Sequence, residues 1–206
     1  MDLSADQIII VIAVLALSIS VHESMHSFVA YALGDRTSHD LGRFSLNPLN
    51  HIDPLTTIAL PLLLITLGAP PFAAAKPVPI DTTRLKWDEW GMALVSAAGP
   101  LSNLALAVLA SFLLRLAGSG ASEVLQSGLL YAVSINVGLG IFNLIPFPPL
   151  DGSRLLYAIA PDGLRGLMLR IEQMGFAAII FFMFIVFPFL SGTLLSVNKF
   201  FLNLFL

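Results

Sequence analysis

The sequence predicts an all-α polytopic membrane protein, and three observations carry this prediction. Hydrophobic residues make up 57% of the 206-residue chain, charged residues make up only 11%, and the mean hydropathy is +0.89. Soluble domains usually carry about 25% charged residues. Several apolar runs reach the length of about 20 residues that a membrane-spanning helix needs. We therefore expect a bundle of about five to six membrane helices or helical segments, forming a single integral-membrane domain over residues 1–206.

The first membrane helix is expected from about Asp6 to Leu33. The stretch 8–20 carries no charge, and Gly34 is a natural C-terminal stop. The N-terminal letters MDLSADQ are acidic and lack the basic region of a secretory signal. The first apolar run is therefore expected to remain in the membrane.

The region after this helix contains many residues that interrupt regular structure. LGRFSLNPLNHIDP (41–54) partly alternates apolar and polar residues, which predicts a short interfacial strand or hairpin. The apolar segment near 55–75 is interrupted by three prolines and a glycine. We expect this segment to be re-entrant or broken, since irregular backbone at membrane depth is tolerated where it lines a cavity.

Three further apolar runs are expected to be membrane spans, and they lie at 91–116, 124–145 and 176–190. The second of these runs ends at the breaker cluster PFPPLDG, and a short helix is expected after Gly152. The tail TLLSVNKFFLNLFL (193–206) places its few polar residues at helical spacing, which predicts an amphipathic helix lying in the interface.

Composition restricts the partners and the metal chemistry. The net charge is −3 and no basic block is present, so nucleic acid is excluded as an expected partner. The chain has no cysteine, which excludes a disulfide framework and a thiolate metal site. Any metal ion must therefore be held by histidine, aspartate or glutamate.

The most informative motif is HESMH, residues 22–26. His22 and His26 are four residues apart, so on a helix both imidazoles lie on one face and can reach one metal ion. Glu23 can sit beside water at that metal, as in the H-E-x-x-H arrangement of zinc metalloproteases. The alternative is three polar residues satisfied within a helix bundle. That alternative is disfavoured because ionisable residues at membrane depth are costly unless they are paired or functional.

A third ligand is needed, since catalytic zinc usually takes three protein ligands. Asp151 is the candidate because, apart from Glu23, it is the carboxylate that ends a clear span beside a backbone break. The alternative for Asp151 is a helix N-cap after a proline turn. For Asp151 to meet the histidines, the run 124–145 must end on the side where the first helix ends. This requires that the segment near 55–75 does not cross the membrane.

The lysines and arginines provide an independent test of this topology. If the segment near 55–75 is re-entrant, eight of the ten basic residues fall on one side, whereas a full crossing divides them six to four. The positive-inside rule favours the first arrangement. We therefore expect the N-terminus outside and the metal site toward the cytoplasmic side. The eight residues are Arg36, Arg43, Lys76, Arg84, Lys86, Arg154, Arg165 and Arg170.

Taken together, HESMH, GPLSN (99–103) and FNLIPFPPLDGSRL (142–155) resemble the site-2 protease family of intramembrane zinc metalloproteases. The similarity continues through LGRFSLNPLNHIDP and AKPVPI, and therefore covers most of the chain. It is closest in kind to the short prokaryotic branch, which has neither a PDZ nor a CBS domain.

The resemblance implies one zinc ion held by His22, His26 and Asp151, with Glu23 as the catalytic acid and base. It also implies regulated intramembrane proteolysis. Such a hydrolase cuts peptide bonds within or near the transmembrane segments of its substrates, in the lipid bilayer of a prokaryotic inner membrane. A membrane metal-ion binding or transport protein that uses the same His/Asp site is the non-enzymatic alternative.

The same resemblance implies that two asparagines, Asn103 and Asn143, lie near the substrate. Asn103 is expected either to hold the substrate backbone or to make an ordinary interhelical hydrogen bond. Asn143 is expected either to donate to the oxyanion or to satisfy carbonyls that Pro146 leaves free. The small residues 97–99 allow close helix approach beside Asn103.

Overall fold

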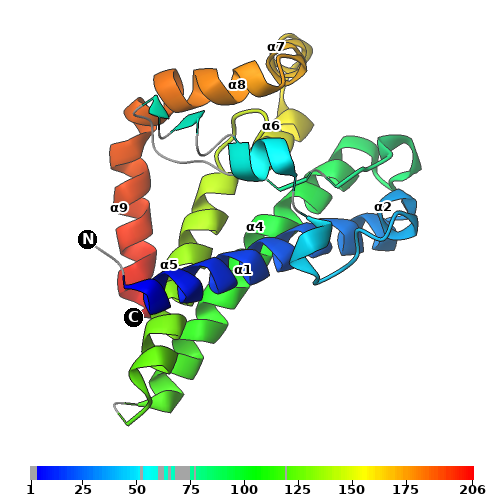
Figure 1. The fold of residues 1–206 in the computed structure, drawn as a ribbon. Helices are drawn as coiled ribbons and strands as arrows, with labels where there is room; N and C mark the ends of the chain where they lie inside the picture. The colour runs from blue at the N-terminus through cyan, green and yellow to red at the C-terminus, as the bar shows by residue number, and fades with distance from the viewer. Residues whose placement is uncertain are drawn as a thin grey trace.

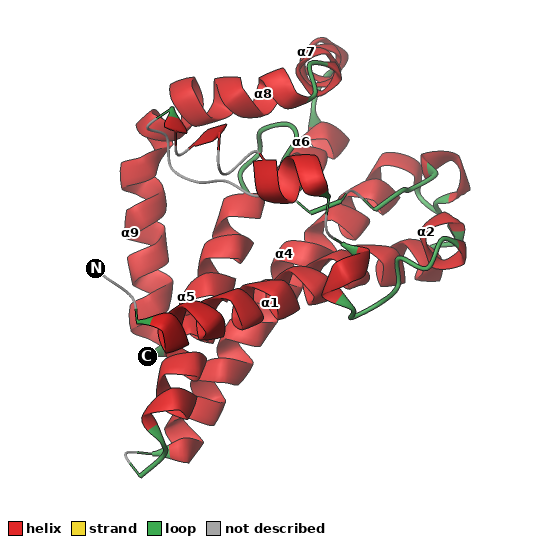
Figure 2. Ribbon diagram, in the orientation of Figure 1, coloured by secondary structure: helices red, strands yellow, loops and turns green. Residues whose placement is uncertain are grey.

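The fold is known from a computed structural model that describes residues 4–51, 53–59, 63–64, 66–67, 75–76, 78–118 and 120–206 (Figure 1). Within these residues every regular element is helical and no strand is present (Figure 2). Four helical stretches are long and apolar enough to cross a membrane, which confirms the all-α membrane fold. They are α1 (Ala5–Ala32), α4 (Asp88–Ala117), α5 (Glu123–Asn143) and the continuous stretch Phe176–Phe205.

The stretch Phe176–Phe205 is divided into α8 (Phe176–Phe181), the π-helical η4 (Phe182–Val186) and α9 (Phe187–Phe205). In Figure 1, α8 runs across the top of the molecule and α9 descends at its left. The bend coincides with the π-helix and with Pro188, two recognised causes of helix kinks. The remaining elements are short: α2 (Thr37–Asp40), η1 (Pro48–Asn50), η2 (Pro54–Ala59), η3 (Thr82–Arg84), α6 (Gly152–Ile159) and α7 (Asp162–Gln173).

Helix α1 begins and ends within one residue of the predicted positions. At its start, Ser4 and Gln7 form a capping box in which each side chain accepts from the other's backbone N–H. At its end, Gly34 has φ 110° and its N–H donates to the Tyr31 carbonyl, while the Asp35 N–H donates to the Ala30 carbonyl. This is a Schellman motif, which explains why a glycine stops the helix here.

Helix α1 buries its polar residues and exposes its apolar ones. Six of its seven buried residues are serine or histidine: Ser18, Ser20, His22, Ser24, His26, Ser27 and Ala30. The exposed large side chains are Ile8, Ile9, Ile12, Leu17, Phe28 and Tyr31. In water this distribution would be unfavourable, but in a bilayer the apolar side chains face lipid and the polar ones find partners inside the bundle.

The C-terminal tail does not form the separate interfacial helix predicted from its polar spacing. It is the second half of α9, and its large apolar residues pack against α4 and α5. The Ser111 hydroxyl of α4 also donates to the Phe205 carbonyl. Small and branched residues on α4 and α5 provide the surface for this packing: Ala107, Ala110, Val133 and Val137 contact Phe201, Leu202 and Phe205.

The strand predicted after α1 is not confirmed, because residues 41–47 are irregular. The Ser45 carbonyl accepts from the Ser24 hydroxyl of α1 and from His51 Nε2, each at 2.7 Å. Side chains therefore occupy the acceptor that a neighbouring strand would use. The broken segment predicted near 55–75 lies partly outside the described residues.

The ends of the segment between α1 and α4 lie close together. The Lys86 N–H donates to the Leu33 carbonyl at 2.9 Å, so α4 begins where α1 ends. Helix α5 returns antiparallel to α4, and α1 packs across both of them (Figure 1). The C-terminal end of α5 is thereby brought to the half of α1 that carries the two histidines.

Candidate metal centre

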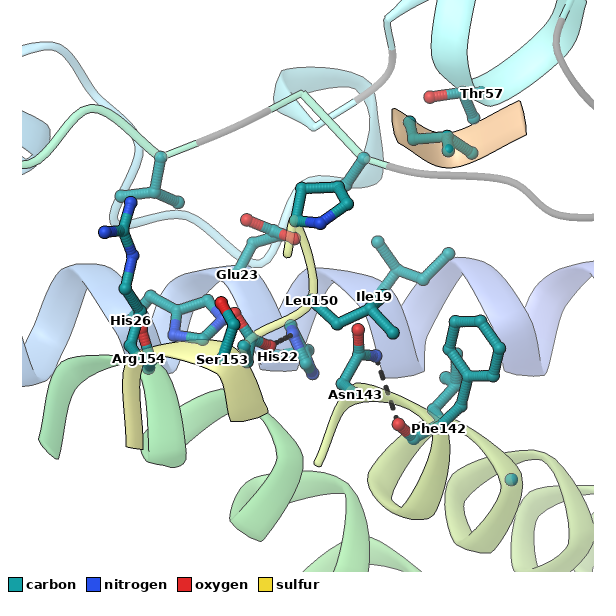
Figure 3. A pocket seen from close by; sticks show the side chains of 18 of the residues that line it. Ile19, His22, Glu23, His26, Thr57, Phe142, Asn143, Leu150, Ser153 and Arg154 are labelled. Atoms are coloured by element: carbon teal, nitrogen blue, oxygen red, sulfur yellow. Dashed lines mark hydrogen bonds and ion pairs between the residues drawn. The ribbon is translucent and has the colours of Figure 1, made fainter. Parts of the chain in front are cut away.

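A histidine pair on α1 and one aspartate far from it in the sequence converge where the C-terminal half of α1 meets the start of α6. His22 and His26 project from α1, and Asp151 lies at the start of α6, which packs against α4. Asp151 Oδ2 lies 3.1 Å from His22 Nε2 and 3.4 Å from His26 Nε2. All three possible ligand atoms lie within 4.8 Å of one another, and both histidines are buried. Figure 3 shows both imidazoles and Glu23 beside the cavity.

Each histidine is oriented by a hydrogen bond at its other ring nitrogen. His26 Nδ1 lies 2.7 Å from the Val95 carbonyl, which can only accept, so this nitrogen carries a proton. His22 Nδ1 lies 2.6 Å from Asn103 Oδ1. With both Nδ1 atoms as donors, both Nε2 atoms are left to direct lone pairs at one carboxylate oxygen. This donor set, two imidazoles and a carboxylate, fits a zinc ion well.

Asp151 occupies the N-cap position of α6, but its side chain makes no capping hydrogen bond. The N-cap alternative is therefore wrong as an account of the carboxylate, which is directed toward the imidazoles instead. Burial favours the neutral form of this carboxyl, but when the His26 and His22 rings are protonated, their charge and hydrogen bonds outweigh burial and hold the pKa of Asp151 below its ordinary range. The ionised carboxylate is the form that binds metal.

Gly99 permits the close approach of α4 to the histidines. A Cβ at this position would lie 2.6 Å from His22 Nε2 and against His26 Nε2 as well. Ala97, Ala98 and Pro100 on the same helix are also buried. Among these small residues, Gly99 has a specific effect: it leaves the two imidazoles free to approach α4, since a Cβ at position 99 would clash with both of them.

Glu23 lines a cavity of about 1140 Å³ that also contains the two histidines and Asp151. No hydrogen bond joins its carboxylate to any part of the chain that the structure describes, which distinguishes it from Asp151. Most of the cavity wall is apolar, and the wall includes Ile19, Leu139 and Phe142. Arg154 and Glu172, neither of which was predicted as a site residue, form an ion pair along the same wall.

Asn103 is fully buried and uses both ends of its amide inside the bundle. Its oxygen faces His22, and its nitrogen donates to Asn136 Oδ1 at 2.8 Å and to the Ser18 carbonyl at 3.3 Å. It does not line the cavity. These contacts favour the interhelical alternative for Asn103 over a hold on the substrate. Asn136 was not anticipated, although an asparagine within an apolar span is a visible signal in the sequence.

Asn143 lines the cavity near its apolar wall (Figure 3). Its amide nitrogen donates to the Leu139 carbonyl of its own helix at 3.1 Å. The side chain of Asn143 therefore reaches the cavity, but its amide NH₂ group is already hydrogen-bonded to a backbone carbonyl of α5. Both alternatives for Asn143 are compatible with this placement.

The comparisons with known proteins agree with this site. A sequence profile of peptidase family M50 matches residues 115–188, a range that contains Asp151. YwhC of Bacillus subtilis (strain 168), described as a zinc metalloprotease, is 40% identical over 181 residues, covering 84% of this chain and 78% of that protein. Rip2 of Mycolicibacterium smegmatis, with the same description, is 35% identical over 176 residues, covering 84% of this chain and 65% of that protein.

A shorter similarity joins the chain to the zinc metalloprotease RasP of Shouchella clausii, which is 34% identical over 68 residues, 30% of this chain and 16% of that protein. No solved structure matches the chain. The similarity to YwhC extends over most of both proteins, and the fold places three side chains that could hold a metal ion inside a bundle of helices long enough to cross a membrane. The chain therefore belongs to peptidase family M50, the site-2 protease family of zinc metalloproteases.

Proposed function

We propose that the protein hydrolyses peptide bonds within or near the transmembrane segments of membrane-protein substrates. The observation that carries this proposal is the convergence of His22, His26 and Asp151 beside Glu23, in a cavity inside a bundle with apolar outer faces. A site inside a bundle with apolar outer faces is more accessible to a segment that lies in the membrane than to a soluble protein. A substrate helix must unwind before cleavage, because its amide groups are engaged in its own hydrogen bonds.

In this proposal His22, His26 and Asp151 hold one zinc ion. When bound, zinc lowers the pKa of water and polarises the scissile carbonyl. Glu23 acts as the general base that takes the proton from the attacking water, and it then delivers that proton to the departing amide nitrogen. Its carboxylate suits this role because no hydrogen bond to the described chain holds it in place. The apolar wall limits the access of other water to the reacting bond.

Asn143 is proposed as the side chain that contacts the substrate. It lies at the cavity wall, and rotation of its side chain would release its amide nitrogen from the Leu139 carbonyl. The released N–H could donate to the oxygen on which negative charge develops. Asn103 is instead proposed as a positioning residue, because its amide holds His22 and is buried away from the cavity.

Replacement of Asp151 by asparagine tests the proposed function in cells. We expect membrane proteins that are normally cut to accumulate with intact spans, because an amide is a poor zinc ligand. Replacing even a hydrogen-bond partner of a ligand lowers zinc affinity by about tenfold or more, so replacing the ligand itself should have at least that effect. Membrane proteomes of cells carrying wild-type or Asp151→Asn protein provide the measurement. Metal analysis of the purified proteins should give one zinc ion for the wild type and a loss for the variant.

The matched control is Asp162→Asn, which makes the same chemical change at an exposed position in the first turn of α7, outside the cavity. Its proteome should equal that of the wild type. Identical proteomes for wild type, Asp151→Asn and Asp162→Asn would contradict the proposed function.

The catalytic end of α1 is proposed to face the cytoplasm, and cysteine labelling can test this orientation. The chain has no natural cysteine, and the side chains of Asp40 and Arg84 are exposed (67% and 61%). We expect Asp40→Cys and Arg84→Cys to react with an impermeant maleimide only after the inner face of the membrane is opened. Glu123→Cys, exposed at the opposite end of the bundle, should react in intact cells. Labelling of position 84 in intact cells would refute the orientation.

A further inference from the structure

We propose that Asn136 of α5 is a positioning residue for the metal centre, acting through Asn103 on the orientation of His22. The inference rests on the proposed zinc site, and it gives α5 a part in metal binding in addition to its placement of Asp151. Asn136 touches neither the cavity nor the metal-binding atoms. Its effect is transmitted by hydrogen bonds that fix, one after another, which end of each amide faces the next group.

The first bond in this series is made to a backbone carbonyl. Asn136 Nδ2 lies 2.9 Å from the carbonyl of Ala132, one turn earlier in α5. A carbonyl can only accept, so this end of the Asn136 amide must be the NH₂ group. The same nitrogen donates to Ser18 Oγ at 2.8 Å, and that hydroxyl in turn donates to the Val14 carbonyl at 2.7 Å. The amide oxygen of Asn136 is therefore directed away from α1 and toward α4.

The second bond transfers this orientation to α4. Asn136 Oδ1 lies 2.8 Å from the side chain of Asn103, which must present its nitrogen to an oxygen. The Ser18 carbonyl, 3.3 Å from the same nitrogen, supports this orientation. Both acceptors act on the NH₂ end of Asn103, so its Oδ1 is directed at His22.

The third bond reaches the metal-binding residue. His22 Nδ1 lies 2.6 Å from Asn103 Oδ1 and must donate to it. Donation through Nδ1 turns Nε2 toward Asp151 with its lone pair available for a metal. If Asn103 were reversed, its NH₂ group would meet Nδ1, and Nε2 would carry the ring proton instead.

Burial makes the network specific. Asn103, Asn136 and Ser18 are 0%, 2% and 2% exposed, so water cannot readily replace a lost partner. The three residues come from α4, α5 and α1, and each amide is held at both ends. His26 has no such dependence, because a backbone carbonyl fixes its Nδ1 directly. The proposed effect therefore concerns one of the two histidines.

Two substitutions at position 136 separate positioning from packing. Asn136→Leu keeps the approximate volume but removes the acceptor for Asn103, and we expect the zinc dissociation constant to rise about 10-fold. Asn136→Asp keeps an oxygen for Asn103 but loses the donor to Ala132. We expect its zinc dissociation constant to stay within about threefold of the wild-type value, although its metal-free form should unfold at a temperature at least as low as that of Asn136→Leu.

The measurements are chelator-competition zinc titrations and thermal unfolding of the metal-free form, using the full-length protein purified in detergent. Asn198→Leu provides the control, because it makes the same change on α9, where the amide oxygen is buried without a partner among the described residues. Its zinc affinity should equal that of the wild type.

The two measurements should rank the variants differently. Zinc affinity should be lower for Asn136→Leu than for Asn136→Asp, whereas metal-free stability should not follow that order. If both measurements rank the variants alike, or if Asn136→Leu binds zinc as the wild type does, the positioning role is refuted. Failure of the wild type itself to bind zinc would instead contradict the proposed function on which this inference rests.

Discussion

Glu23→Gln should remove peptide cleavage while leaving zinc bound. The amide has nearly the shape of the carboxylate, but it cannot take a proton from water. General acid–base catalysis contributes about 10²–10⁴-fold to rate, so we expect cleavage to fall by at least about 100-fold. Zinc should be retained because the cluster of possible ligands consists of His22, His26 and Asp151, and Glu23 is not part of it. Cleavage would be measured on a membrane protein that accumulates uncut in the Asp151→Asn cells.

The control for this prediction is Glu123→Gln at the exposed start of α5. It should cleave and bind zinc as the wild type does. A zinc-loaded Glu23→Gln protein that cleaves at the wild-type rate would contradict the assigned acid–base role. Loss of zinc from this variant would instead identify Glu23 as a ligand. In a metal transporter the same substitution would change metal flux across vesicles and leave membrane proteins unaffected.

Gly99→Ala should weaken zinc binding strongly, although it adds only one methyl group. The new Cβ would lie 2.6 Å from His22 Nε2 and against His26 Nε2, and both are proposed ligating atoms. Either the rings must turn away from Asp151 or α4 must move away from α1. Because both changes break the ligand geometry, we expect the zinc dissociation constant to rise about 100-fold. Chelator competition on the purified protein provides the measurement.

Gly128→Ala is the matched control, since it adds the same methyl group in a membrane helix. Its Cβ would lie 3.7 Å from Ile10 Cγ2, which is an ordinary van der Waals contact. Zinc affinity should therefore be unchanged. If Gly99→Ala binds zinc as tightly as the wild type does, then α4 does not lie as close to the two histidines as the structure shows.

The parts of the fold that local chemistry specifies were predictable from the sequence. Gly34 ends α1 through a motif that nearly requires glycine, so the boundary follows from one residue. The spacing of His22 and His26 follows from the pitch of a helix. Asp151 was reached less directly, from the need for a third ligand and from its place at a backbone break that ends a clear span. The distribution of basic residues then favoured a topology in which it can reach the histidines. The short distance between the ends of α1 and α4 agrees with that topology.

The parts that depend on how helices rotate against one another were not predictable. Both the buried and the exposed faces of α4 are largely apolar, so hydropathy does not show which of its faces meets α1. Asn103 could therefore be given two roles, and its contact with His22 emerged only from the packing. The same limitation applies to the tail, whose polar spacing indicated an interfacial helix although Phe201 and Phe205 pack on α4 and α5.

The two parts of the metal centre are made at different times during synthesis. His26 and Asp151 are 125 positions apart (151 − 26), and the histidines lie on α1, which is synthesised before the other described helices. A nascent chain therefore carries the histidine pair in the membrane long before its carboxylate partner exists. A zinc ion held by all three residues would connect α1 to the turn between α5 and α6, like a cross-link that closes a long loop. Under the proposed function, cleavage can begin only after Asp151 has joined the histidine pair, so neighbouring membrane proteins would not meet a partly assembled enzyme.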